Sequence, residues 1–141
     1  MQSQTLSRQG QAVSETAFLR RALQSDALFS LLSSLVFIFA AGPVARFIGP
    51  DVPSWIILIL GVGFVPFVAS IYWITTVIEA RWRYARIIAT MNVLWTVASY
   101  LVLFLAWSEF TVAGRWFIAL QAEVTFVLGI WQIFGLRRLV R

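Results

Sequence analysis

One carboxylate in the middle of an apolar stretch is the side chain best placed to do chemistry. Glu123 falls near the midpoint of residues 114–136, which are long enough to cross a bilayer as a helix. A charge at that depth costs roughly 2.5–3.5 kcal/mol on insertion scales, so such a residue normally has a partner or a function. A protonated Glu123 would join helices as a hydrogen-bond donor, and an ionised one would couple to a proton or a cation.

The same stretch carries a second polar face. Gln121, Thr125 and Gln132 share one helical stripe, at spacings of four and seven residues. Glu123 is two residues from Gln121, about 200° around the helix, so it points the opposite way. One helix of a lone bundle cannot turn both faces inward. Whichever face is outside therefore needs a partner, and we expect this helix to lie at an interface with a second chain.

Two further polar stripes share one design. When the sequence is shifted so that Asp26 lies over Asn92, the stripes that coincide are Asp26, Ser30 and Ser33, and Asn92, Thr96 and Ser99. Small and hydroxyl residues let helices approach closely, so the simpler interpretation is two packing seams. The functional interpretation is a polar pocket in the cytoplasmic third of the membrane, where Asp26, Asn92 and Gln132 are expected at similar depth. The shift also suggests a tandem repeat of helical hairpins.

Composition requires that lipid surrounds these residues. Hydrophobic residues make up 60% of the chain and charged residues only 12%, against about 25% charged in an average soluble domain. The basic residues are all arginine and fall at the ends of apolar runs rather than in one patch. This distribution is typical of membrane topology signals, and we expect no binding to nucleic acid.

The residue types that are missing limit the chemistry. The sequence has no Cys and no His, which excludes thiolate and imidazole metal sites and the commonest haem ligands. The serines on the stripes lack a base, and Asp26 and Glu123 are expected too far apart to share a substrate atom. We therefore predict no enzyme, no metal and no dedicated cofactor, although the aromatic surfaces could contact lipid, quinone or pigment.

Four apolar runs predict an all-α, four-helix transmembrane bundle. The expected spans are residues 27–45, 55–78, 87–107 and 114–136, within one domain at 18–141 that follows a flexible cytoplasmic tail at 1–17. Ser14 is expected to cap the first helix. Residues 28–42 also imitate a signal peptide, but Pro43 falls where cleavage would occur, so a true span is expected. Short connections predict an up-down-up-down arrangement.

Arginine counts predict the orientation. Nine arginines fall on the side of both termini and of the middle loop, and two fall on the other side. The nine are Arg8, Arg20, Arg21, Arg81, Arg83, Arg86, Arg137, Arg138 and Arg141. The two are Arg46 and Arg115. Cytoplasmic loops carry the excess of positive charge. Both termini are therefore expected in the cytoplasm, with the protein in a bacterial inner membrane.

Three segments resemble a known group of proteins. They are Phe-Leu-Arg-Arg-Ala-Leu-Gln-Ser-Asp-Ala-Leu at 18–28, Asn-Val-Leu-Trp-Thr-Val-Ala-Ser at 92–99 and Gly-Leu-Arg-Arg at 135–138. They are similar to a family of small bacterial four-span membrane proteins without an assigned activity. The resemblance covers most of the chain after Phe18 and implies the same four-span architecture. Glu123 falls outside its motifs.

Two functions fit these features. The first is a non-catalytic accessory or assembly subunit that docks laterally, through the fourth helix, on another membrane protein or on copies of itself. The alternative is a small oligomeric transporter or channel that uses Glu123 for proton or cation coupling. In size and helix count the chain is similar to the small multidrug-resistance exporters, which also have a membrane-embedded Glu. Their carboxylate is in the first helix, whereas Glu123 is in the last.

Overall fold

The structure is a computed structural model that describes the backbone of residues 2–140 and the side chains of residues 10 and 13–139. In this part of the chain it has six α-helices and two short 3-10 helices. The elements are α1 (Gln2–Phe39), α2 (Ala41–Ile48), α3 (Ser54–Thr76), α4 (Ile78–Arg81), η1 (Trp82–Tyr84), α5 (Ala85–Leu105), η2 (Trp107–Glu109) and α6 (Val112–Val140). Four stretches are long and apolar enough to cross a membrane, namely Val13–Phe39, Ser54–Thr76, Ile78–Leu105 and Val112–Leu139. The predicted all-α, four-span class is confirmed.

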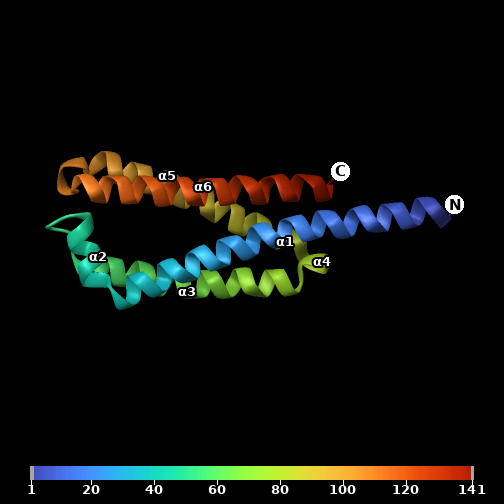
Figure 1. Ribbon diagram of the computed structural model, residues 1–141, viewed down its shortest axis with the longest axis horizontal. Helices are drawn as coiled ribbons and strands as arrows, with labels where there is room; N and C mark the ends of the chain where they lie inside the picture. The colour runs from blue at the N-terminus through green and yellow to red at the C-terminus, as the bar shows by residue number, and fades with distance from the viewer. Residues whose placement is uncertain (1, 141) are drawn as a thin grey trace.

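The four long helices run alternately up and down in an elongated bundle (Figure 1). Both termini and α4 lie at one end, here called the terminal end, and α2 lies at the other, the α2 end. α1 packs along α3 and α6, and α5 packs along α6, but α3 and α5 hardly touch. The bundle is therefore a ring of four helices with one loosely closed side, between α3 and α5.

The first span differs from the expected 27–45. α1 ends at Phe39, and a separate helix, α2, carries the rest of the apolar run. Pro43 explains the break, because it has no N–H for the carbonyl of Phe39, and its ring would clash with that carbonyl in a continuous helix. In the first turn of α2 the missing N–H costs nothing, since helices leave their first N–H groups unpaired.

The start of α1 also differs from the expectation. The backbone is helical from Gln2, whereas a tail without regular structure was predicted at 1–17 and a helix start at Ser14. No proline interrupts this segment, and its Gln, Ser and Arg residues tolerate helix well. Ser14 therefore lies inside α1 and not at its start.

α6 runs from Val112 to Val140, beyond the expected 114–136 at both ends, and its start is capped. The hydroxyl of Thr111 accepts a hydrogen bond from the N–H of Gly114 at 2.9 Å, as a helix N-cap does. The N–H of Thr111 donates to the carbonyl of Ile48 at 2.9 Å, and its hydroxyl donates to the carbonyl of Phe47 at 2.7 Å. Thr111 thus begins α6 and ties it to the end of α2.

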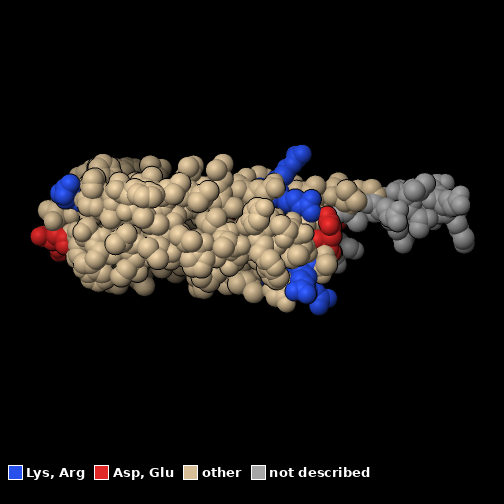
Figure 2. Space-filling model, turned by 90° about the horizontal axis from the view of Figure 1, so that it is seen from below, with Lys and Arg blue, Asp and Glu red and all other residues tan. Residues whose placement is uncertain are grey.

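On the face that Figure 2 shows, the charged side chains gather at the two ends of the bundle, and none lies along the length between them. Large side chains such as Phe104 and Leu105 are more than 70% exposed, which a water-soluble protein would avoid. At the terminal end Arg138 stacks on Phe18 at 4.3 Å, and at the α2 end Arg115 stacks on Trp107 at 4.3 Å. Arginine and aromatic side chains are what membrane interfaces favour.

Candidate functional site

A buried carboxylate joins three helices in the interior of the bundle. Asp26 of α1 accepts hydrogen bonds on Oδ2 from Asn92 Nδ2 of α5, at 2.6 Å, and from Gln132 Nε2 of α6, at 2.7 Å. Its other oxygen accepts from Ser30 Oγ at 3.2 Å. Asn92 Nδ2 also donates to Gln132 Oε1 at 3.3 Å. All four side chains are buried. We call them the polar node; the structure brings together the three residues that were expected at similar depth.

The two residues at equivalent positions of the proposed repeat meet in this node. Asp26 and Asn92 belong to α1 and α5, which lie diagonally across the bundle and are joined through their side chains rather than along their backbones. Gly129 of α6 makes room for this, because a Cβ at Gly129 would lie 3.2 Å from the Cβ of Asn92. Close approach at a small residue is how membrane helices pack.

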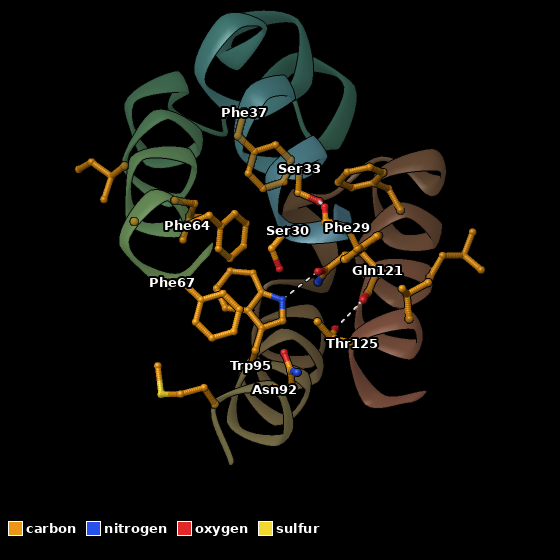
Figure 3. Close-up of a pocket in the computed structure, with 17 residues that line it drawn as sticks. Phe29, Ser30, Ser33, Phe37, Phe64, Phe67, Asn92, Trp95, Gln121 and Thr125 are labelled. Carbon is orange, nitrogen blue, oxygen red and sulfur yellow. Dashed lines mark hydrogen bonds between the residues drawn. The ribbon is translucent and has the colours of Figure 1, made fainter. Parts of the chain in front are cut away.

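A cavity of about 550 Å³, here called the central cavity, adjoins the polar node (Figure 3). Its apolar lining is mostly aromatic: Phe29, Phe37, Phe64, Phe67, Trp95 and Phe117. Its polar lining is Ser30, Ser33, Asn92, Gln121 and Thr125. The exposed apolar residues of the lining come from three helices: Ile59 of α3, Met91 of α5, and Leu120 and Val124 of α6. A cavity of this size is within the ~300–1,000 Å³ range of small-molecule sites.

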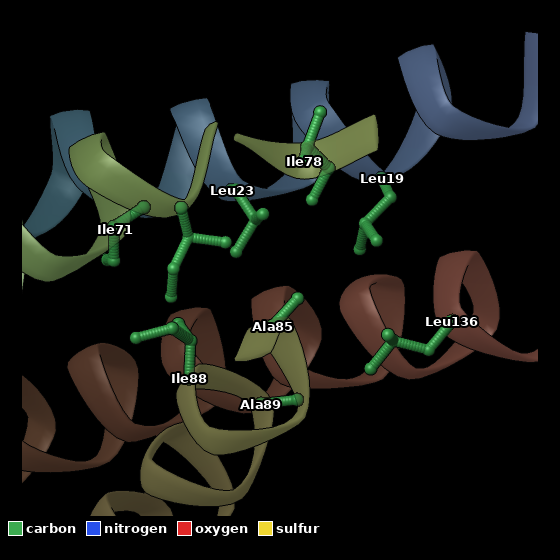
Figure 4. Close-up of a cluster of buried hydrophobic side chains, with 9 residues drawn as sticks. Leu19, Leu23, Ile71, Ile78, Ala85, Ile88, Ala89 and Leu136 are labelled. Atoms are coloured by element: carbon green, nitrogen blue, oxygen red, sulfur yellow. The ribbon is translucent and has the colours of Figure 1, made fainter. Parts of the chain in front are cut away.

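Apolar residues separate the node from the terminal end (Figure 4). The cluster consists of Leu19, Leu23, Ile71, Ile74, Ile78, Ala85, Ile88, Ala89 and Leu136. On α1 and α5 these residues precede Asp26 and Asn92, and on α6 Leu136 follows Gln132. The polar node is therefore enclosed on the side of both termini by packed aliphatic side chains.

A second hydrogen-bonded chain crosses the wall of the central cavity nearer the α2 end. Trp95 Nε1 donates to Gln121 Oε1 at 2.8 Å, and Gln121 Nε2 donates to Ser99 Oγ at 2.9 Å. Beyond it lies a cavity of about 480 Å³ that shares Trp95 and Gln121 with the first. Sequence reasoning singled out Gln121 and Ser99 but not Trp95, although Trp95 stands inside the segment 92–99 that carries the repeat.

The remaining hydroxyls on the stripes bond mainly to backbone. Ser33 Oγ donates to the carbonyl of Phe29 at 2.9 Å, and Thr125 Oγ1 donates to that of Gln121 at 2.6 Å. Thr96 Oγ1 donates within its own helix and also to the carbonyl of Ala122 on α6, at 3.3 Å. These contacts agree with the packing-seam interpretation of the stripes.

Glu123 points away from the stripe that faces the interior. Gln132 and Thr125 of that stripe are buried, whereas Glu123 is exposed on the outer face of α5 and α6 and lines neither cavity. Its Oε1 accepts a hydrogen bond from the hydroxyl of Tyr100, on α5. Sequence reasoning missed Tyr100, since nothing in the sequence gives the register between α5 and α6 that brings it beside Glu123.

Within the described part of the chain no three His, Cys, Asp or Glu residues come close enough to hold a metal ion. Compared with known proteins, the chain matches no family model, no curated protein and no solved structure.

Proposed function

We propose that this protein is a non-catalytic accessory or assembly subunit that docks laterally on another membrane protein through the outer face of α5 and α6. The observation that carries the proposal is the exposed Glu123, hydrogen-bonded by Tyr100, on an otherwise apolar surface. Val127 and Trp116, which lie one turn after and two turns before Glu123 on α6, are exposed and apolar and line neither cavity.

The depth of Glu123 supports a protein partner rather than water. It follows Arg115 by eight residues and precedes Arg137 by fourteen, which places it roughly 12 Å and 21 Å from them along the axis of α6. With the two arginines at the surfaces, Glu123 lies well inside a hydrocarbon core of about 30 Å. A carboxylate at that depth is usually paired, and Tyr100 supplies one donor. The proposed partner is a transmembrane helix with an amide, hydroxyl or cationic side chain that donates to the other oxygen.

We also propose that the protein lies in a bacterial inner membrane with both termini in the cytoplasm. The support is the distribution of arginine: at the terminal end the described arginines are Arg20, Arg21, Arg81, Arg83, Arg86, Arg137 and Arg138, and at the α2 end they are Arg46 and Arg115. Asp51 and Glu109 lie at the α2 end as well. The excess of positive charge belongs on the cytoplasmic side.

Site-specific photo-crosslinking in native membranes tests the docking face. A photoreactive residue at Val127, one helical turn from Glu123, is expected to capture one defined membrane protein. The same residue at Val62, exposed on α3, is the matched control and is expected to capture lipid. Replacing Glu123 by Ala in the Val127 variant should lower the yield several-fold, and peptide mapping should locate the crosslink in a transmembrane helix that has a donor side chain.

The oligomeric transporter is separated from docking by the same experiment. In a single chain Glu123 lines neither cavity, so a transport path through it would have to be enclosed between copies. Crosslinks from Val127 to a second copy of this chain would favour that alternative. Crosslinks of equal yield at Val127 and Val62, or yields insensitive to Glu123→Ala, would contradict the proposed docking face.

A further inference from the structure

We propose that the central cavity binds a single-chain membrane amphiphile whose head is an uncharged hydroxyl group, and that this hydroxyl donates a hydrogen bond to Oδ1 of Asn92. Asn92 is only 2% exposed and lines the cavity. The proposal concerns the interior of the bundle and is independent of docking at the outer face of α5 and α6.

The hydrogen bonds of the polar node determine which side-chain atom of Asn92 faces the cavity. Nδ2 donates to Asp26 and to Gln132, and turning the amide over would place Oδ1 against the Asp26 carboxylate. Oδ1 therefore points away from the node and accepts no hydrogen bond from any side chain that the structure describes. Figure 3 shows Asn92 below Trp95, with its side-chain oxygen toward the cavity. Among the described residues only Arg20 Nε is both fully buried and unpaired, so Oδ1 of Asn92 borders open space, where a ligand can supply the donor.

Most other polar groups on the lining are already engaged as donors. Ser30 Oγ donates to Asp26 and can still accept, which places a second acceptor beside Asn92. Trp95 donates to Gln121, and Gln121 donates to Ser99 with one N–H, which leaves its second N–H free. The end of the cavity next to the node thus offers acceptors, and a hydroxyl group fits them better than a carbonyl or an ether.

The surroundings of Asn92 exclude a charged head. Asn92 follows Arg86 by six residues, roughly 9 Å deeper along α5, and the aliphatic cluster that contains Leu23 and Ile88 closes the node toward the terminal end. A phosphate head placed there would meet no cationic side chain among the described residues that line the cavity. An ammonium head would meet no acidic one, because the carboxylate of Asp26 lies behind Ser30 and Asn92 and does not line the cavity. The chain of the ligand would lie against the aromatic lining and reach the bilayer at the exposed lining residues, such as Ile59 and Met91.

Photolabelling with a matched pair of probes tests the proposal. The probes are octadecanol with a diazirine at mid-chain and its methyl ether, which keeps the chain and removes the donor. In nanodiscs, we expect the alcohol to label the cavity residues Phe64 and Met91 about fivefold to tenfold more than the ether, the ratio that one hydrogen bond supplies. Phe104, which is 79% exposed and lines neither cavity, should be labelled equally by both.

Variants at Gly63 supply the structural control. A Cβ at Gly63 would meet nothing within 4 Å, and Gly63 lines the cavity. Gly63→Trp should fill the cavity and remove the preference for the alcohol, whereas Gly63→Ala should keep it. Asn92→Leu should also abolish the preference for the alcohol over the ether. If that variant does not fold, the probe pair and the Gly63 variants still test the proposal.

Competition distinguishes the sources of such a ligand. Protection by unlabelled octadecanol would assign a straight-chain alcohol, and protection by farnesol would assign an isoprenoid alcohol. Equal labelling of Phe64 and Met91 by alcohol and ether would overturn the proposal. So would labelling no stronger than at Phe104, or protection by neither competitor.

Discussion

Removing the carboxylate of Asp26 should destabilise the bundle by an amount that the geometry of the polar node predicts. In Asp26→Ala, Asn92 of α5 and Gln132 of α6 each lose an interhelical hydrogen bond, of 2.6 Å and 2.7 Å. Interhelical hydrogen bonds in membrane proteins contribute about 0.6 kcal/mol on average and at most about 1.7. Two of them give an expected loss of about 1–3 kcal/mol in the free energy of unfolding.

Asp26→Asn is the matched variant that keeps the shape of the side chain. Its amide oxygen can occupy the place of Oδ2 and accept from both Asn92 and Gln132, while its NH₂ group faces Ser30 Oγ, which can accept instead of donate. The substitution also replaces an ionisable side chain by a neutral amide, whose burial in a membrane costs less than that of an ionised carboxylate. We expect the free energy of unfolding of Asp26→Asn to lie within about 1 kcal/mol of the wild-type value or above it.

The assay is reversible unfolding in mixed micelles with increasing SDS, followed by circular dichroism. Asp51→Ala, which removes an exposed carboxylate at the α2 end, serves as the control and should leave the transition unchanged. If Asp26→Ala were as stable as the wild type, or if Asp26→Asn lost as much stability as Asp26→Ala, the carboxylate would not join the three helices as described.

Two further predictions concern packing and orientation. Gly114→Ala should lower the free energy of unfolding by about 1–3 kcal/mol in the same assay, because the new Cβ would lie 2.7 Å from Cα of Ile48 and closer still to its carbonyl oxygen. At Gly63 a new Cβ meets open space, so Gly63→Ala should change the free energy of unfolding by less than about 1 kcal/mol. Equal effects of the two substitutions would contradict the close contact of α6 with α2. Since the chain has no cysteine, Asp51→Cys should react with a membrane-impermeant maleimide on spheroplasts, whereas Arg83→Cys should react only after lysis, and the reverse pattern would refute the proposed orientation.

Periodicity predicted which residues share a helical face and a depth, but it left open which face of residues 114–136 turns inward. The structure turns Thr125 and Gln132 inward, and Asp26 meets Asn92 at the same depth, as antiparallel spans of known length predict. The separation of Glu123 from Thr125 and Gln132 follows from the same 100° step per residue.

Features that depend on the register and neighbourhood of helices could not be predicted. Tyr100 contacts Glu123, and Trp95 contacts Gln121, because of the register in which α5 and α6 pack. The close contact at Gly129 belongs to this register. The sequence does not say which of the four helices stand side by side, so the loose contact between α3 and α5, and the cavity behind it, were missed. The break at Ala40 was missed because the apolar composition continues across it.

Native mass spectrometry after mild extraction from the cell's own membrane tests the central claim most directly. We predict that the wild-type chain leaves the membrane in a complex with a larger membrane protein, and that Glu123→Ala releases it from that complex. A chain that carries only lipid, as a monomer in both wild type and variant, would contradict docking through the outer face of α5 and α6.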